Sequence, residues 1–168
     1  MAGASRSNWP LALLAIAVLF VDQASKLAVD RLTSPGSFQV VIPGLLNLVH
    51  TSNPGVAFGL FADSQALWRA PLLIVFSVAV IGLIIWMLAT GRAGGPLGRY
   101  GLALILGGAA GNVVDRLFHH GVTDFIDFHF GTYHWYTFNV ADTAIVIGAA
   151  LVIIELLRDG RRVGQENA

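Results

Sequence analysis

Residues 70–90 have the sequence APLLIVFSVAVIGLIIWMLAT, from Ala70 to Thr90, without a single charged side chain. A helix needs roughly 20 consecutive apolar residues to cross the hydrocarbon core of a bilayer. This segment alone therefore predicts a transmembrane helix. The whole chain agrees with it, because 55% of its 168 residues are hydrophobic and only 12% are charged. Soluble domains carry roughly 25% charged residues, so the composition predicts an integral membrane protein.

Three further segments are long and apolar enough to cross a membrane. The first of them contains the uninterrupted apolar run Leu11–Val21, which also fits the hydrophobic region of a cleaved signal peptide. Cleavage there would leave three spans and give the Asp22 and Lys26 pair no role. We therefore predict an all-α integral membrane protein, a single domain of residues 1–168 whose four transmembrane helices lie at about 9–29, 70–90, 98–117 and 140–157.

Lysine and arginine near the ends of the spans predict how the protein is oriented, since cytoplasmic loops carry an excess of them. They gather before the first span, between the second and third, and after the fourth, at Arg6, Arg92, Arg99, Arg158, Arg161 and Arg162. Outside the predicted helices and their edges, the other two connections carry only Arg31 and Arg69. Both termini are therefore predicted to be cytoplasmic, and residues 30–69 and 118–139 to face the outside.

The connection after the first span is long for a loop. It contains the runs Phe38–Ile42 and Leu45–Val49, which are rich in β-branched and apolar residues and are separated by Pro43-Gly44. Two such runs around a turn signal are typical of a β-hairpin. We expect a small extracytoplasmic β-element, at about residues 34–66, between the first and second helices.

Charged side chains within the spans mark the place where chemistry is expected. Each costs about 2.5–3.5 kcal/mol at the centre of a bilayer and is a functional candidate for that reason. The charged residues in or at the spans, with one just beyond the third, are Asp22, Lys26, Asp115, Arg116, Asp142 and Asp124. The predicted orientation brings all of them toward the outer side. Convergence at one depth is expected of an active site and not of scattered structural pairs.

Helical spacing places several polar residues on shared faces. The pairs are Asp22 with Lys26, Asn112 with Asp115, and Asn139 with Asp142. Gly107 and Gly111 form a GxxxG pair that permits close approach of another helix.

Each polar residue also has a plainer interpretation. Asp22 and Lys26 fit a packing and positioning pair better than a catalytic one. Arg116 could extend to lipid headgroups, and Asn139 could be a simple N-cap with Asp142 in the first turn. Asp124 could be a surface charge on a loop, and for Asp127 that is the favoured interpretation.

Composition excludes several kinds of site. The chain has no Cys, hence no disulfide and no cysteine nucleophile, and its net charge of zero gives no electrostatic footprint for nucleic acid. Imidazole is a common zinc ligand, and four histidines lie after the third span, at His119, His120, His129 and His134. They form neither an HExxH motif nor an i,i+4 pair, so we expect no metal and no cofactor.

Five motifs resemble those of a known family, the prolipoprotein signal peptidases, also called signal peptidase II. Gly111-Asn-Val-Val-Asp-Arg116 resembles its GNxxDR motif. Val122–Asp127 and Phe138–Ala144 resemble its two catalytic aspartate motifs. Asp22-Gln-Ala-Ser-Lys26 is similar to its DQxxK motif, and Asn53–Phe58 to its NxGxAF loop. All five occur in the family's order, from about residue 20 to about residue 145.

The resemblance implies a catalytic pair of aspartates, Asp124 and Asp142. It implies support from Asn112, Arg116 and Asn139 with Asp115 nearby, and a site or substrate cleft shaped by Asp22, Lys26, Asn53 and Gly55. The implied substrates are prolipoproteins carrying diacylglyceryl on a cysteine, cut just before that cysteine. The implied setting is the bacterial inner membrane with the site toward the periplasm. We expect the enzyme to contact membrane lipid and to act as a monomer.

Two carboxylates suit this reaction, because like charges at close range share one proton and so provide a base and an acid together. The pair titrates as a unit, so the sequence does not assign the proton to either aspartate. Two other functions stay open at this point. Intramembrane charges also mark transporters and proton relays, although the predicted second span offers no polar group to continue a path. A non-catalytic membrane subunit would tolerate the replacement of Asp142.

Overall fold

The four apolar segments are four helices in the computed structural model, which describes residues 8–53, 68–119 and 121–166. They are α1 (Trp9–Leu32), α2 (Arg69–Ala89), α3 (Pro96–Phe118) and α4 (Val140–Glu166). Each of the four contains a stretch long and apolar enough to cross a membrane. Pro10 and Pro96 stand in the first turns of α1 and α3, where the missing N–H costs no helical hydrogen bond. The predicted four-helix membrane fold is therefore confirmed for the described residues.

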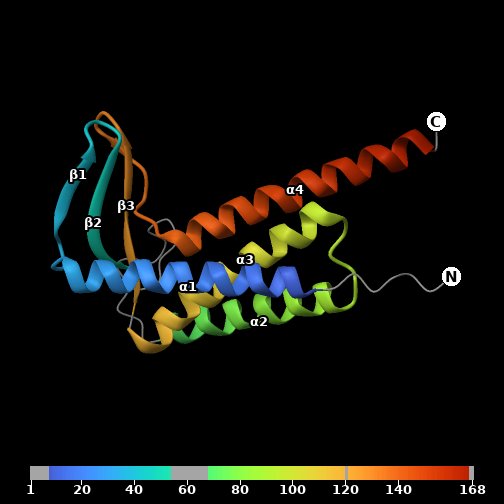
Figure 1. Ribbon diagram of the computed structural model, residues 1–168, viewed down its shortest axis with the longest axis horizontal. Helices are drawn as coiled ribbons and strands as arrows, with labels where there is room; N and C mark the ends of the chain where they lie inside the picture. The colour runs from blue at the N-terminus through green and yellow to red at the C-terminus, as the bar shows by residue number, and fades with distance from the viewer. Residues whose placement is uncertain (1–7, 54–67, 120, 167–168) are drawn as a thin grey trace.

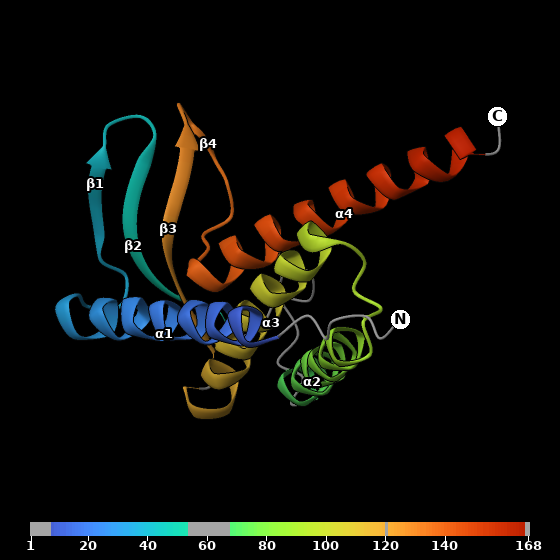
Figure 2. The same cartoon turned by 45° about the vertical axis from the view of Figure 1, so that its right-hand side comes forward.

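Helix α3 is the centre of the bundle. Of its most apolar stretch, 56% is buried inside the protein, against 22% for α1 and α4 and 6% for α2. Figure 2 shows α3 between α4 and α2, with α1 crossing it. The residues of α1 that are buried recur with helical spacing, at Leu11, Ala15, Asp22, Lys26 and Val29. Large apolar side chains elsewhere point outward, for example Phe20 and Phe76, as expected for a surface covered by lipid.

Glycines permit the close packing of α3. A Cβ at Gly101 would stand 2.6 Å from the carbonyl oxygen of Gly148, and one at Gly108 would collide with the carbonyl of Ala141, both on α4. A Cβ at Gly107 would instead stand 2.6 Å from a carbonyl oxygen of α1. Small residues at these positions let the three helices approach within backbone contact, as in other membrane helix pairs.

The β-element is larger than predicted. It is an antiparallel sheet in the order β1 (Phe38–Ile42), β2 (Leu46–Asn53), β3 (Val122–Phe130), β4 (Tyr133–His134). The expected hairpin between the first two helices is present as β1 and β2. The expectation that the β-element would lie only there is wrong, because β3 and β4 come from the connection between α3 and α4.

The sheet stands across one end of the bundle. It adjoins the end of α1 and the start of α4, whereas the start of α1 and the end of α4 lie at the far end of the molecule (Figure 1). An antiparallel β-bridge between Ile126 of β3 and Phe138 places the segment just before α4 next to β3. This arrangement brings residues from β2, β3, α3 and α4 to one place, where the predicted site residues gather.

Candidate active site

Asp124 is almost completely enclosed, with 1% of its surface exposed. It lies in β3, so its expected place on a loop is wrong, as is the interpretation of a solvated surface charge. Its Oδ1 accepts a hydrogen bond of 2.7 Å from Asn139 Nδ2, and its Oδ2 accepts one of 3.0 Å from Asn53 Nδ2. Two amides from different elements therefore hold the carboxyl group in a single orientation.

Asp142 is in the first turn of α4 and is partly exposed. Its Oδ1 accepts a hydrogen bond of 2.9 Å from Asn112 Nδ2, and its backbone N–H donates to Asn139 Oδ1 at 3.0 Å. Asn139 thus does act as a helix cap, as the plain interpretation proposed. The same side chain also binds Asp124, so one fully buried asparagine connects the two aspartates.

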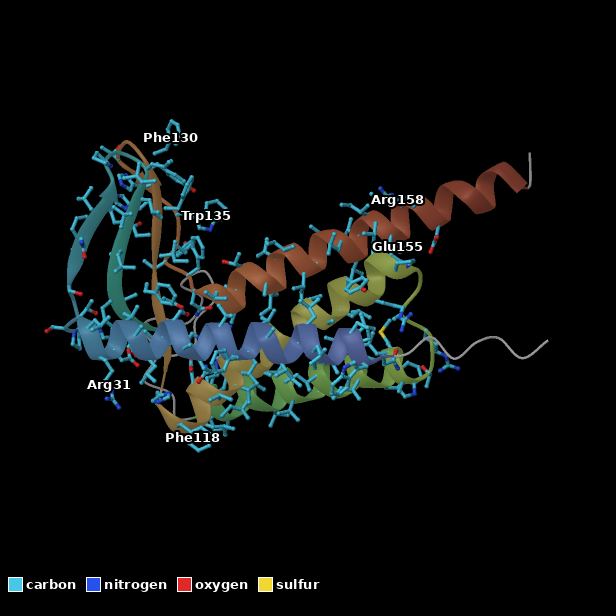
Figure 3. All side chains as sticks on the ribbon, in the orientation of Figure 1. Arg31, Phe118, Phe130, Trp135, Glu155 and Arg158 are labelled. Atoms are coloured by element: carbon cyan, nitrogen blue, oxygen red, sulfur yellow. The ribbon has the colours of Figure 1, made fainter. Side chains whose placement is uncertain are left out.

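Both aspartates line one cavity of about 660 Å³. Its polar wall is completed by Asn53, Asn112 and Arg116. Its apolar wall combines residues of the segment before α4 with the lipid side of that helix, namely Trp135, Tyr136, Phe138, Ile145, Val146 and Ile147. Figure 3 shows Trp135 between the sheet and the start of α4. The cavity therefore places two carboxyl groups beside an apolar surface.

The environment of Asp124 favours a bound proton. Burial is the largest cause, and the nearby charge of Asp142 acts in the same direction, so the pKa of Asp124 rises from its ordinary value of 3.8 to about 6. The hydrogen bonds from Asn53 and Asn139 stabilise the carboxylate and limit the rise in pKa. A raised pKa on one acid beside a second, more exposed acid is the pattern expected of a general acid and a general base.

Arg116 turns inward and not toward lipid headgroups. Its Nη1 donates to the carbonyl oxygen of Asn112 at 3.1 Å, and the residue lines the cavity with both aspartates. Its Nε is buried with no hydrogen-bond partner among the described residues. The guanidinium is therefore a cation at the wall of the cavity with a donor still to be satisfied.

Asp22, Lys26 and Asp115 form a buried charged cluster next to the cavity wall. Lys26 Nζ lies 2.8 Å from Asp22 Oδ2, 2.6 Å from Asp115 Oδ2 and 3.1 Å from Asn112 Oδ1. Since the amide oxygen of Asn112 faces this cation, its NH2 group faces Asp142. Asp22 Oδ1 also accepts the backbone N–H of Ala141 at 2.9 Å. The cluster therefore orients Asn112 and the start of α4, in line with a positioning role.

Gln23 belongs to the same cluster but was not singled out from the sequence. Its Nε2 donates to Asp115 Oδ1 at 2.9 Å and to the carbonyl of Gly111 at 3.3 Å. Its place as the second residue of the DQxxK-like motif was the available signal. The aromatic run before Asn139 was likewise not identified as a cavity wall. Gly55 lies outside the described residues.

The histidines after α3 do not gather around Asp124. His134 Nδ1 lies 2.9 Å from Asp127 Oδ1, and its ring stacks on His129 with centroids 4.7 Å apart. Asp127 is 4% exposed and accepts a 2.7 Å hydrogen bond from Asn47, so its interpretation as a surface charge is wrong. Burial would raise the pKa of Asp127, but the hydrogen bonds from Asn47 and His134 hold it below its ordinary value. His120 lies outside the described residues.

The chain is similar to known proteins over most of its length. The family model described as signal peptidase (SPase) II matches residues 14–158. The lipoprotein signal peptidase of Solibacter usitatus is 43% identical over 155 residues, which cover 92% of this chain and 94% of that protein. The lipoprotein signal peptidase of Cupriavidus taiwanensis is 42% identical over 161 residues, covering 95% and 90%.

Solved structures share the fold as well. A bacterial membrane enzyme determined by the in meso method at 2.3 Å resolution superposes with a TM-score of 0.80 at 28% identity, covering 90% of this chain and 89% of that one. A second, at 1.9 Å resolution, gives a TM-score of 0.75 at 26% identity, covering 89% and 94%. The family match spans most of the chain and includes every described residue of the cavity's polar wall. The chain therefore belongs to the signal peptidase II family of aspartic peptidases.

Proposed function

We propose that this protein is an endopeptidase that removes the signal peptide from diacylglyceryl-modified prolipoproteins, cutting just before the lipidated cysteine. The similar proteins of Solibacter usitatus and Cupriavidus taiwanensis bear the name lipoprotein signal peptidase. The single observation that carries the chemical part is that Asp124 and Asp142 line one cavity and are connected by Asn139. Such a pair can hydrolyse a peptide bond without a metal ion or a nucleophilic side chain.

In this mechanism Asp124 starts protonated and Asp142 starts ionised. The raised pKa of Asp124 supports that assignment. Asp142 takes a proton from water as the water oxygen bonds to the scissile carbonyl carbon, and Asp124 gives its proton to the carbonyl oxygen. Asp142 then protonates the leaving nitrogen and the C–N bond breaks. Asp124 recovers a proton as the new carboxyl group forms, which returns both acids to their starting state.

The polar neighbours have supporting roles in this proposal. Asn53, Asn112 and Asn139 hold the two carboxyl groups in place through the amide hydrogen bonds described above. Arg116 supplies a fixed cation for a carbonyl or a lipid phosphate. The cluster of Asp22, Lys26 and Asp115 keeps the Asn112 amide in the required orientation. Gly55 keeps the role that the family resemblance implies, which is to shape the substrate cleft.

The proposed orientation in the membrane follows from the Lys and Arg residues near the ends of the helices. We infer that both termini are cytoplasmic, that the sheet and the cavity face the periplasm, and that the whole chain forms one membrane domain. We further propose that the enzyme acts as a monomer. Val146 and Ile147 belong both to the cavity wall and to the exposed side of α4. Substrate acyl chains can therefore stay in lipid, where each buried CH2 contributes about 0.8 kcal/mol.

The test is cleavage of a lipid-modified precursor by the purified protein in detergent, beside the same precursor without the diacylglyceryl group. We expect cleavage of the modified form only, and loss of cleavage in Asp124→Asn and Asp142→Asn. Asp159→Asn, which changes an acid near the far end of α4, is the matched control and should cleave normally. EDTA should leave the rate unchanged. Normal cleavage by either of the first two variants, or loss with EDTA and recovery with zinc, would disprove the aspartate pair.

A further inference from the structure

The hydrogen bonds of β2 conflict with the geometry of a regular strand. Asn47 binds Asp127 on β3, and Asn53 binds Asp124 on the same strand. Side chains alternate between the two faces of a strand. Asn47 and Asn53 are an even number of residues apart and would share a face, whereas Asp124 and Asp127 are an odd number apart and face opposite sides. An uninterrupted β2 would therefore point Asn53 away from Asp124.

A β-bulge in β2 removes the conflict. Leu48 pairs with Ile126 and Thr51 pairs with Asp124, so two residues of β2, Val49 and His50, stand opposite the single residue Phe125 of β3. The extra residue shifts the alternation by one position, which brings Thr51 and Asn53 to the face of Asp124. Bulges beside active sites commonly re-aim a side chain in this manner. The orientation of Asn53 therefore depends on the bulge being kept at His50.

His50 is fixed by the end of α1. Its Nε2 lies 3.2 Å from Asp30 Oδ1, and its Nδ1 lies 3.0 Å from Thr33 Oγ1. The same Asp30 Oδ1 accepts a hydrogen bond of 3.3 Å from Thr123 Oγ1 on β3, next to Asp124. We call Asp30, Thr33, His50 and Thr123 the α1 clasp. It connects the bulge of β2 and the start of β3 to one helix end.

The backbone around the bulge is fixed as well. His50 N–H donates to the carbonyl of Ser37 at 3.1 Å, and Gly36 N–H donates to the carbonyl of His50 at 2.8 Å. The bulge residue is thus bonded through its ring to α1 and through its backbone to the segment that leads from α1 into β1. A shift of the bulge along β2 would break all of these contacts together.

We propose that the α1 clasp is a positioning device for catalysis, which keeps the bulge at His50 so that Asn53 donates to Asp124. The proposal rests on the proposed function, because it assigns a role to the clasp only through Asp124. Asp30 is the residue to change, since its carboxylate contacts both strands. Asp30→Ala removes both contacts, whereas Asp30→Asn keeps a side-chain oxygen that can accept them.

We expect Asp30→Ala to lower kcat roughly tenfold or more, because misplacing a reacting group by about 1 Å costs on the order of 100-fold. KM should change little, since no residue of the clasp lines the cavity. The alkaline limb of the pH–rate profile should move to higher pH, because the Asn53 hydrogen bond lowers the pKa of Asp124. Asp30→Asn should recover most of the rate. The side chain of Arg31 points away from the sheet in Figure 3, so Arg31→Ala is the control and should cleave at close to the wild-type rate.

A double-mutant cycle separates positioning from simple stabilisation of the sheet. If Asp30 acts through Asn53, adding Asp30→Ala to Asn53→Ala should cause no further loss of kcat. Additive losses, a wild-type rate in Asp30→Ala, or an unmoved pH profile would overturn the proposal. Should Asp30→Ala fail to fold, Thr123→Val removes a single contact of the clasp and enters the same cycle. If Asn53→Ala and Asp124→Asn both cleave normally, the result contradicts the catalytic role of Asp124 in the proposed function and not the role of the clasp.

Discussion

Replacing Asp124 by Asn should make the protein more stable relative to the wild type at neutral pH than at acidic pH. The carboxyl group of Asp124 is buried beside the charge of Asp142, and both effects raise its pKa. The folded protein therefore binds this proton more tightly than the unfolded chain does. It follows that the stability which the protonated group provides is fully present below its unfolded pKa of 3.8 and is lost as the pH rises through about 6.

The size of the effect follows from the two pKa values. The difference between about 6 and 3.8 is 2.2 units, and each unit corresponds to about 1.36 kcal/mol. The wild type should thus lose about 3 kcal/mol between acidic and neutral pH through this one group. The asparagine variant has no such pH-dependent loss of stability at this position. It does lose one of the two hydrogen bonds from Asn53 and Asn139, because an amide offers one acceptor oxygen, at a cost of about 1–3 kcal/mol that is independent of pH.

Thermal unfolding in detergent, followed by the fluorescence of the four tryptophans, measures the prediction. The comparison is the Tm of Asp124→Asn minus that of the wild type, at about pH 4 and again at about pH 7.5. The constant hydrogen-bond cost and the titrating groups that do not interact with Asp124 cancel in this difference. About 2.4 kcal/mol of the total is lost between these two pH values, because pH 4 already lies slightly above 3.8. The difference should therefore grow by roughly 5–10 °C on going to the higher pH, at 2–4 °C per kcal/mol for a domain of this size. An equal difference at both pH values would mean that Asp124 ionises like an ordinary carboxyl group, and the acid role assigned to it would be wrong.

Three further variants test the packing around the site. Lys26→Met leaves two buried aspartates without their cation, so it should cost about 3–5 kcal/mol and lower the Tm far more than a surface change does. Gly108→Ala forces α3 away from α4, so it should lower the free energy of unfolding by about 1–3 kcal/mol and remove most of the cleavage activity. The control is Gly82→Ala on α2, where an added Cβ meets nothing within 4 Å. It should leave both the Tm and the cleavage rate unchanged. Glu155→Gln should lower the free energy of unfolding by up to about 2 kcal/mol, seen as a lower Tm, while cleavage stays normal. Glu155 Oε2 accepts the backbone N–H of Leu97 at 3.0 Å at the positive end of α3, remote from the cavity (Figure 3).

The helices could be predicted from the sequence because one physical requirement dominates them. A span must be apolar over the thickness of the bilayer, and that requirement is visible residue by residue. The same requirement says nothing about where α4 ends as a helix. Its predicted span ends at residue 157, yet the helix continues to Glu166. The criterion detects only the apolar part of a helix, and the last turns carry charges and two glycines.

Strand β3 was not predicted because its polar residues are satisfied by distant partners. Asp127 looked like a surface charge, yet Asn47 binds it from a position 80 residues earlier in the chain. Asp124 looked like a loop residue for the same reason. The period-2 pattern that identifies a strand assumes that one face is apolar, whereas both faces of β3 bear a buried aspartate. Only the tertiary contacts show that such a segment is a strand.

The site is divided between the sheet and the helices, and Asn139 connects the two parts through its hydrogen bonds to Asp124 and Asp142. Its backbone precedes α4 and its side chain binds Asp124, while Asp142 follows three residues later in the first helical turn. The spacing from Asn139 to Asp142 is therefore fixed by local helix geometry. Asp124 is connected to that same turn by one hydrogen bond of 2.7 Å from Asn139. A small movement of the sheet on the bundle would change the contact from Asn139 first, because Asn53 and Asp124 both belong to the sheet. Both asparagines lower the pKa of Asp124, but Asn139 also connects it to the first turn of α4, whereas Asn53 connects it to the bulged strand β2.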